Sequence, residues 1–328
     1  MTQLPNAATL RAIIELACRA PSVHNSQPWL WSLHQTELRL YADARHGVPV
    51  ADPHGRQMIL SLGAVLHHFE AASAASGWRT SVSRLPNPNR PDHVATIEFG
   101  GRQRPLRAFG EREAAIKRRF TDRLPMRAPT ASDLQTVLDA VAPAIDAHLS
   151  LLSETSRQAV AQTSKTVAAE RRYDYAYHTE LDWWTTDGDG RDSNEGVPAP
   201  TLLSSSEAER VPVARDFSPI AANQPRRADI SADEAAVIVL SSPTDQRHDL
   251  LRCGEAMSML LLEATVAGLS TCIVSHVTES PSGRATISRL IGEVGQPQVL
   301  VRVGRGIRED SASKLTPRRP VDDVFDIV

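Results

Sequence analysis

The chain has 328 residues with 36 basic and 39 acidic side chains, a net charge of −3 and 41% hydrophobic residues, enough for one large core or two modest ones. This charge balance, with only 5% aromatic residues, argues against a nucleic-acid partner, which normally requires a basic surplus or stacking aromatics. No apolar run reaches the roughly 20 residues of a membrane span and the first residues lack the pattern of a secretory signal, so we expect a cytoplasmic protein without membrane contact.

The first third of the chain predicts a mixture of helices and strands. Leu10, Ile13, Ile14 and Ala17 recur at helical spacing, and the pattern stops before Pro21. Alternating apolar residues then predict a hairpin, and a stretch rich in small residues predicts a tightly packed helix. The expected elements are a helix at 10–17, hairpin strands at 29–33 and 38–40, a helix at 56–76, and strands at 79–84 and 93–99.

The second part begins with a basic segment, 100–112, whose glycine and proline residues predict a linker. Thr130 followed by Asp133 predicts a capped helix start, and apolar residues continue at helical spacing over 134–141. The further expected elements are one helix of about 28 residues from Val160 to beyond Trp184, strands at 235–241, 271–276 and 297–303, and helices at 247–268 and 284–291.

Two helical patterns recur along the chain and predict an internal duplication. The stretch at 10–17 matches 134–141 at an offset of 124 residues, whereas the two long helices match at an offset of 191. The growing offset predicts an insertion of about 67 residues at roughly 160–230, and hence halves at 1–105 and 106–328. Chance similarity of amphipathic helices is the alternative. The aligned long-helix positions are Arg56, Leu60, Gly63 and Gly77 on Arg247, Leu251, Gly254 and Gly268.

The insertion predicts a helix followed by a polar segment, 185–230, with little periodicity. The aspartates within 187–198 resemble the start of a calcium-binding loop. However, Arg191 and Pro198 stand where that loop needs ligands, and Asp192 stands where it needs glycine. We therefore interpret this segment as a solvated loop or mobile lid and expect no metal site.

Several common catalytic architectures are excluded by motif. None of the three lysines follows a glycine, so there is no phosphate-binding P-loop. The three cysteines lie far apart, which argues against a disulfide framework or a zinc ribbon, and no nucleophile-elbow or zinc-protease motif is present. Phosphate binding would have to use arginine, whose planar fork holds phosphate through paired hydrogen bonds.

The stretch APSVHNSQPW at 20–29 gathers serine, histidine, asparagine and glutamine side chains between a helix end and a strand. Pro21 and Pro28 bound it and fix the local backbone. Such a turn can present amides and backbone groups to a flat polar heterocycle. A loop that satisfies its own hydrogen bonds is the alternative.

A second candidate stretch, KRRFTDR at 117–123, is strongly basic. In an extended segment Arg119, Thr121 and Arg123 share one face, where two guanidinium forks and a hydroxyl suit a phosphate dianion. A solvated run of charges is the alternative.

Together these stretches resemble the nitroreductase-like FMN flavoprotein superfamily. The segment 21–29 is similar to its PSxxNxQPW motif, and 117–123 is similar to the RRSxR segment with which it grips the FMN phosphate. The DPHGR sequence at 52–56 is most similar to the Acg-like branch. The C-terminal stretches PQVLVRVGRG at 297–306 and PRRP at 317–320 resemble the family's last core strand and closing basic motif.

This resemblance implies an α+β fold of two nitroreductase-like halves, each a mainly antiparallel sheet with packed helices, joined as an intramolecular pseudo-dimer. It implies an FMN cofactor, with NAD(P)H as reductant and a nitroaromatic or quinone acceptor, in a ping-pong reaction that needs no catalytic side chain. The alternative is a protein that stores FMN or senses redox state beneath its lid. The implied cofactor-binding residues are Pro21, Ser22, Val23, Asn25, Gln27, Arg119, Thr121, Arg123, Val274, Ser275, His276, Arg318 and Arg319.

The two halves carry different parts of this implied site. The first half has the PSVHNSQPW turn but no basic residue before its first helix, and the second half has the basic segment but no such turn after its helix. We therefore expect one FMN per chain, bound across the two halves without a partner chain.

Overall fold

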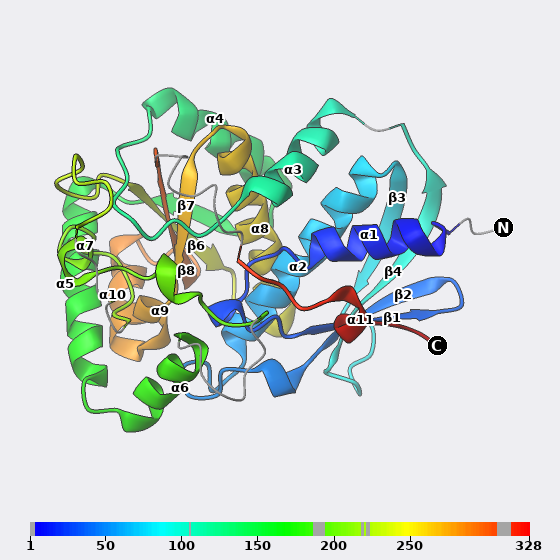
Figure 1. The fold of residues 1–328 in the computed structure, drawn as a ribbon, viewed down its shortest axis with the longest axis horizontal. Helices are drawn as coiled ribbons and strands as arrows, with labels where there is room; N and C mark the ends of the chain where they lie inside the picture. Colours follow the sequence, from blue (N-terminus) through cyan, green and yellow to red (C-terminus); the bar gives the residue numbers. More distant parts are fainter. Residues whose placement is uncertain (1–3, 105, 186–193, 218–219, 221–223, 307–315) are drawn as a thin grey trace.

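The structure, a computed structural model, describes residues 4–104, 106–185, 194–217, 220, 224–306 and 316–328. Two separate sheets lie on either side of a pair of long helices, α2 (Arg56–Ala75) and α8 (Arg247–Val266), which pack against each other between them (Figure 1). The main apolar core runs from the first sheet through this helix pair to the second sheet. This arrangement is the predicted α+β architecture.

The first sheet has five strands in the order β3-β4-β2-β1-β9. The predicted hairpin and the two following strands are confirmed, and all of these pair antiparallel. The short β9 was not predicted; it pairs parallel to β1 and brings the C-terminal tail onto the first sheet (Figure 1, red). The tail therefore crosses the predicted boundary at 105. The strands are β1 (Trp29–His34), β2 (Glu37–Ala42), β3 (Trp78–Arg84), β4 (His93–Arg102) and β9 (Phe325–Ile327).

The second sheet has four antiparallel strands in the order β5-β6-β8-β7. Its central strands β6 and β8 are buried along almost their whole length, which explains their unbroken runs of apolar residues. The strand expected at 271–276 ends earlier, at Val274, because Ser275 turns the chain into a short helix. The strands are β5 (His148–Leu151), β6 (Ala236–Ser242), β7 (Ser270–Val274) and β8 (Gln296–Gly304).

The helices that match in sequence also match in their local structure. Asn6 caps α1 (Ala7–Ala17) by accepting from Thr9 N, and Thr130 caps α4 (Ala131–Val141) by accepting from Asp133 N, as predicted for the second. Gly77 and Gly268 follow α2 and α8 with φ angles of 77° and 80°, a left-handed conformation that favours glycine. These correspondences support the predicted duplication.

The predicted linker at 100–112 is wrong, because α3 (Arg107–Arg118) begins inside it. Ala115 and Ile116 of this helix pack on Ala71 of α2 and Leu262 of α8. Burial of these apolar side chains stabilises the helix against both halves. The outer face is charged and carries pairs of opposite sign one turn apart, such as Arg107 with Glu111. The basic composition of the segment thus belongs to an exposed helix face.

The described part of the insertion is more ordered than predicted. Its helix is divided into α5 (Glu154–Arg171) and α6 (Tyr175–Thr185), because Asp174 interrupts the run and accepts from Tyr177 N at the second helix start. The interpretation of 185–230 as a solvated loop is also wrong for its described residues, since five apolar side chains there are buried. These are Val197, Leu202, Val211, Val213 and Ile230.

The remaining elements are short or peripheral. The helix predicted at 284–291 is confirmed as α10 (Pro281–Leu290). By length and composition α2 could cross a membrane, but 72% of that stretch is buried inside the protein, as expected of a core helix. The other elements are α7 (Ser205–Ala208), α9 (His276–Glu279), α11 (Val321–Val324), and the 3-10 turns η1 (Val23–Asn25), η2 (Ala44–His46), η3 (Ala142–Ala144) and η4 (Ala199–Thr201).

Candidate functional site

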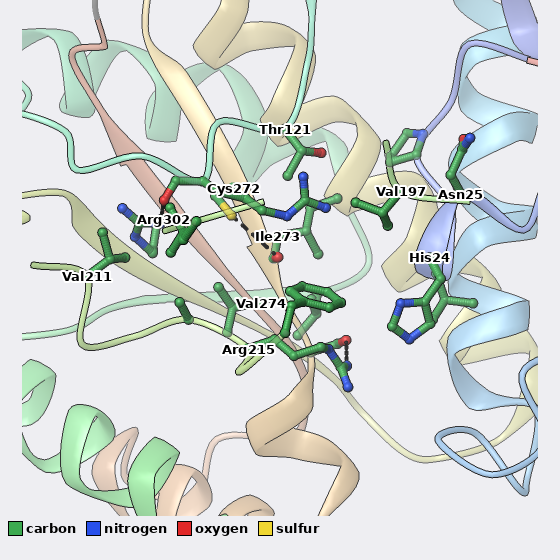
Figure 2. Close-up of a pocket in the computed structure, with 18 of the residues that line it drawn as sticks. His24, Asn25, Thr121, Val197, Val211, Arg215, Cys272, Ile273, Val274 and Arg302 are labelled. Atoms are coloured by element: carbon green, nitrogen blue, oxygen red, sulfur yellow. Dashed lines mark hydrogen bonds between the residues drawn. The ribbon is translucent and has the colours of Figure 1, made fainter. Parts of the chain in front are cut away.

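A cavity of about 500 Å³ lies between the two halves. Figure 2 shows His24 and Asn25 of the first half on one side, and Cys272, Ile273 and Val274 of β7 on the other. The insertion contributes further walls through Val197, Val211 and Arg215 (Figure 2). The cavity brings together most of the residues that the resemblance implied: Pro21, Ser22, Val23, Asn25, Arg119, Thr121, Arg123, Val274, Ser275 and Arg318.

The PSVHNSQPW turn has an unusual backbone. His24, Asn25 and Gln27 have φ angles of 48°, 57° and 51°, a region that residues other than glycine rarely adopt. Ser22 Oγ accepts from Gln27 N at 3.0 Å, and Val23 N donates to Ser61 Oγ of α2 at 3.2 Å. Such strain persists only where the surroundings hold it, and it concentrates at functional sites.

The amides of this turn bind the protein itself. Asn25 Nδ2 donates to Gly196 O and Pro317 O, at 3.0 and 3.2 Å. Gln27 does not line the cavity; its side chain donates to Asn194 O and accepts from Arg319 N, both at 2.9 Å. These two side chains therefore join the turn to the insertion and to the C-terminal tail.

One end of the cavity is strongly basic. Arg19, Arg119 and Arg318 gather there, and among the described residues none of the three forms an ion pair. Burial, and then the neighbouring Arg19, lowers the pKa of Arg119 to about 10. The Nε and Nη1 atoms of Arg119 are buried, and no described residue offers either of them a hydrogen-bond partner. Buried donors left without a partner are costly, so this end is suited to an anion.

Arg123 and Thr121 line the cavity beyond Arg119, as the predicted alternation required. The backbone at Thr121 is extended and forms a bridge to Thr271 beside β7. Arg123 donates to Thr201 Oγ1 at 3.2 Å and lies over the Phe217 ring, with 5.7 Å from its guanidinium carbon to the ring centre. Residues of the insertion thus already contact the Arg123 guanidinium, whereas no hydrogen bond joins the described insertion residues to that of Arg119.

Two buried ion pairs fix the basic segment from behind. Arg227 binds both oxygens of Asp122 at 3.0 Å. Arg302 pairs with Asp233 at 2.6 Å and also donates to Leu124 O at 3.1 Å. These contacts hold the chain after Arg119 in its extended form, and no sequence pattern predicts them.

Two other implied residues lie outside the cavity. His276 is buried in α9, and its Nε2 lies 2.7 Å from Ser164 Oγ. Arg319 donates to Gln27 O at 3.3 Å and lies 3.4 Å from a carboxylate oxygen of Glu195. Both therefore support the walls, and of the two adjacent arginines only Arg318 lines the cavity.

The other end of the cavity contains residues that sequence reasoning missed. His24 lies within the PSVHNSQPW turn, and its buried Nε2 has no partner in the described ranges. Burial, and then Arg215, lowers the pKa of His24 to about 3. Phe217 of the insertion meets the His24 ring edge-on at 6.1 Å. Arg215 pairs with Glu279 and also donates to Tyr177 Oη at 2.6 Å. Neutral, apolar and hydrogen-bonding groups here suit a flat aromatic ligand.

Similar proteins identify the family. The Mycobacterium tuberculosis protein named "Putative NAD(P)H nitroreductase acg" is 40% identical over 319 residues, covering 97% of this chain and 95% of that protein. The chain belongs to the Acg family of nitroreductase-like proteins. An uncharacterized protein of the same organism is 41% identical over 324 residues, covering 97% of this chain and 93% of its own length. No protein-family model matches the chain.

The solved structures to which this Acg-family chain is similar include two proteins named as nitroreductases. The FMN-dependent nitroreductase NfnB from Mycobacterium smegmatis, in complex with NADPH, has a TM-score of 0.41 and 16% identity, covering 65% of this chain and 96% of that one. A nitroreductase with bound FMN from Desulfitobacterium hafniense has a TM-score of 0.40 and 15% identity, covering 64% and 93%.

Proposed function

We propose that this chain is an FMN flavoprotein that uses NAD(P)H to reduce a nitroaromatic or quinone acceptor. The observation that carries the proposal is the cavity between the halves, with unpartnered arginine donors at one end and the PSVHNSQPW turn along its wall. The names of the family relatives support the activity. A cytoplasmic location belongs to the same proposal.

The residues present fit a flavin mononucleotide. The free donors of Arg119, with Thr121 and Arg123 beside it, would hold the phosphate, because charge-assisted paired hydrogen bonds favour a dianion. Ser22 and Val23 would face the polar edge of the ring system, and the end of β7 at Val274–Ser275 would face its reactive centre. FMN, when bound, supplies the hydride acceptor and donor. The protein supplies anchoring, orientation and exclusion of water.

A single chain provides both sides of this site. The turn comes from the first half and the basic segment from the second, so no partner chain is required. At the His24 end of the cavity Glu279 is paired with Arg215, and a pKa of about 3 leaves His24 unprotonated and only weakly basic at neutral pH. Proton supply in this proposal therefore comes from solvent.

FMN storage is the second candidate function, and one observation favours it. The described segment 194–217, which we name the lid segment, is bound to the turn through Asn194 and Gly196 and to the second half through Arg215. A covering held at both ends limits access to the flavin face. Sequestration or redox sensing without turnover would then follow.

Anaerobic mixing of the purified flavin-loaded chain with NADPH separates the two functions. An oxidoreductase should lose its absorbance near the flavin maximum within seconds and regain it on addition of a quinone. A storage protein should keep its colour over minutes with NADPH and yet bleach with dithionite. A chain that binds no FMN would contradict both functions.

A further inference from the structure

Arg318, which the family resemblance implied as a cofactor-binding residue, has no donor left for a phosphate. Its Nε donates to Cys18 O at 3.0 Å. Its Nη1 donates to Thr316 O and Pro317 O at 3.2 and 2.9 Å, and its Nη2 to Arg19 O and Ala20 O at 3.2 and 3.3 Å. A guanidinium has five N–H groups, and here five backbone carbonyls receive them.

Three of those carbonyls belong to Cys18, the C-cap residue of α1, and to Arg19 and Ala20, which follow it. The last carbonyls of a helix have no partner within it, and a cation there also interacts favourably with the helix dipole. Arg318 thereby caps α1 from the C-terminal tail. It also fixes the chain that leads from α1 into Pro21 and the PSVHNSQPW turn.

Arg19 differs from Arg318, because its guanidinium still has donors available for a ligand. Its side chain lines the basic end of the cavity, and its buried Nε has no partner among the residues that the structure describes. Its Nη2 lies 3.5 Å from Thr316 O, and within the described ranges it forms no ion pair. Glu15, one turn earlier on α1, is the acidic group that acts on it, and that side chain is exposed.

Arg19 and Arg119 meet across the two halves. Arg119 Nη2 donates to Arg19 O at 3.4 Å, so the two residues lie against each other at the same end of the cavity. Three of their buried N–H-bearing nitrogen atoms have no partner in the part of the chain that the structure describes: Nε of Arg19, and Nε and Nη1 of Arg119. Two adjacent positive charges that still have hydrogen-bond donors to offer repel each other, and a bound anion would relieve this repulsion.

We propose that Arg19 and Arg119, one from each half, are the phosphate-binding pair, and that Arg318 is a positioning residue that fixes Arg19 by capping α1. This inference rests on the proposed function, because it takes the bound anion to be the phosphate of FMN. In this assignment the first half contributes a phosphate-binding arginine as well as the PSVHNSQPW turn. The C-terminal tail positions that arginine and does not itself bind the phosphate.

The test compares FMN with riboflavin, which has the same ring system without the phosphate. Dissociation constants are measured on the flavin-free chain by quenching of flavin fluorescence, and the melting temperature of each flavin-free variant is recorded. The variants are Arg19→Met and Arg318→Met, which keep length and remove charge. Arg11→Met is the matched control, since Arg11 lies on α1 and pairs with Asp322 of the tail outside the cavity.

Arg19→Met should weaken FMN about 10- to 100-fold and riboflavin little, and should leave the melting temperature of the flavin-free chain unchanged or higher. Arg318→Met should lower that melting temperature and weaken both flavins by similar factors, because the cap is lost. Arg11→Met should leave the ratio of the two affinities at the wild-type value.

Two results would overturn the assignment. One is an Arg19→Met variant with the wild-type ratio of FMN to riboflavin affinity. The other is an Arg318→Met variant that loses this ratio while keeping the wild-type melting temperature, as a direct phosphate ligand would. A wild-type chain that binds FMN no better than riboflavin would instead contradict the phosphate anchoring in the proposed function.

Discussion

Gly63 and Gly254 face each other where α2 crosses α8, and neither position has room for a side chain. A Cβ on Gly63 would lie 2.1 Å from Leu251 O, and a Cβ on Gly254 would lie 2.2 Å from Leu60 O. The sequence alignment pairs these same residues, Gly63 with Gly254 and Leu60 with Leu251. A reciprocal contact between equivalent residues is typical of a two-fold interface, so it supports descent from a symmetric dimer.

Alanine at either glycine should destabilise the chain. We expect Gly63→Ala and Gly254→Ala each to lower the free energy of unfolding by about 1–3 kcal/mol or more, because backbone and not a flexible side chain must move. Gly110→Ala is the control: it lies in α3 with nothing near its would-be Cβ, and should raise stability by about 0.5–1 kcal/mol. Urea unfolding measures all three, and equal effects would contradict the close crossing.

The helices with strong periodicity and the strands with clear alternation could be predicted, and so could Arg119 and the PSVHNSQPW turn. Arg19 could not, because a single arginine at a helix end has no pattern of its own; only its place next to the motif was a signal. The short β9 depends on pairing with β1 from the far end of the chain, which local sequence does not encode. The role of Arg318 depends on five carbonyls from two distant segments.

Removing the basic segment's charges should release the cofactor. We expect Arg119→Ala to weaken FMN retention by about 1.5–3 kcal/mol, and Arg123→Ala by less, because Arg123 already has Thr201 and Phe217 as partners. Arg118→Ala, at an exposed neighbouring position, is the control. Flavin absorbance per chain after dialysis at high salt is the measurement; an Arg119→Ala variant as yellow as the control would refute the assignment.

Acid should destabilise the buried helix pair. His68 lies at the crossing with its Nδ1 2.7 Å from Ser258 Oγ, and burial, followed by Arg119, holds its pKa well below 6.5. Below pH 6.5 the unfolded chain therefore binds a proton that the folded chain does not, so the free energy of unfolding falls as the pH drops.

The matching experiment is urea unfolding at pH 8 and pH 5. His68→Gln should reduce the loss of stability between these two pH values by about 2 kcal/mol, whatever its effect at either pH alone. The exposed His54→Gln should retain the full loss. A His68→Gln variant with the wild-type difference would show that His68 is not the titrating group.

The attachment of the lid segment to the second half should depend on the Arg215–Glu279 pair, whose side chains are 8% and 3% exposed. Burial alone would raise the pKa of Glu279, but Arg215 outweighs it and holds that pKa at about 2. Arg215→Met leaves a buried carboxylate without its partner, which is strongly unfavourable. We expect faster thermolysin cleavage within 194–217 and faster reduction by NADPH.

The control for the lid experiment is Arg127→Met, which breaks a pair with Asp229 that is about half exposed on both sides and contributes at most about 1 kcal/mol. It should keep the wild-type cleavage pattern and reduction rate. If Arg215→Met is cleaved faster within the lid segment and yet reduced at the wild-type rate, the lid segment does not limit access to the flavin.

We expect each chain to bind one flavin, because the second site that the duplication would create differs from the first. A symmetric pair of halves would have two equivalent cavities, so each residue at the existing site has a counterpart at the other. At the offset of 191, Ser61 of the existing cavity corresponds to Arg252, and at the offset of 124, Ser22 corresponds to Asp146. Where the first site has two small serines, the second has a bonded pair, with Arg252 Nη2 2.7 Å from Asp146 Oδ2.

More charge fills the same counterpart region. Arg252 also binds Glu255, and Glu255 binds Arg84 of β3 with 2.6 Å between Nε and Oε1. A flavin placed there would have to separate these ion pairs, and it would find no counterpart of the Arg19–Arg119 pair for its phosphate. We therefore expect one FMN per chain from the flavin absorbance of the loaded protein and from titration of the flavin-free chain. A stoichiometry near two would show that the ion pairs open to admit a second flavin and that the divided-site model is wrong.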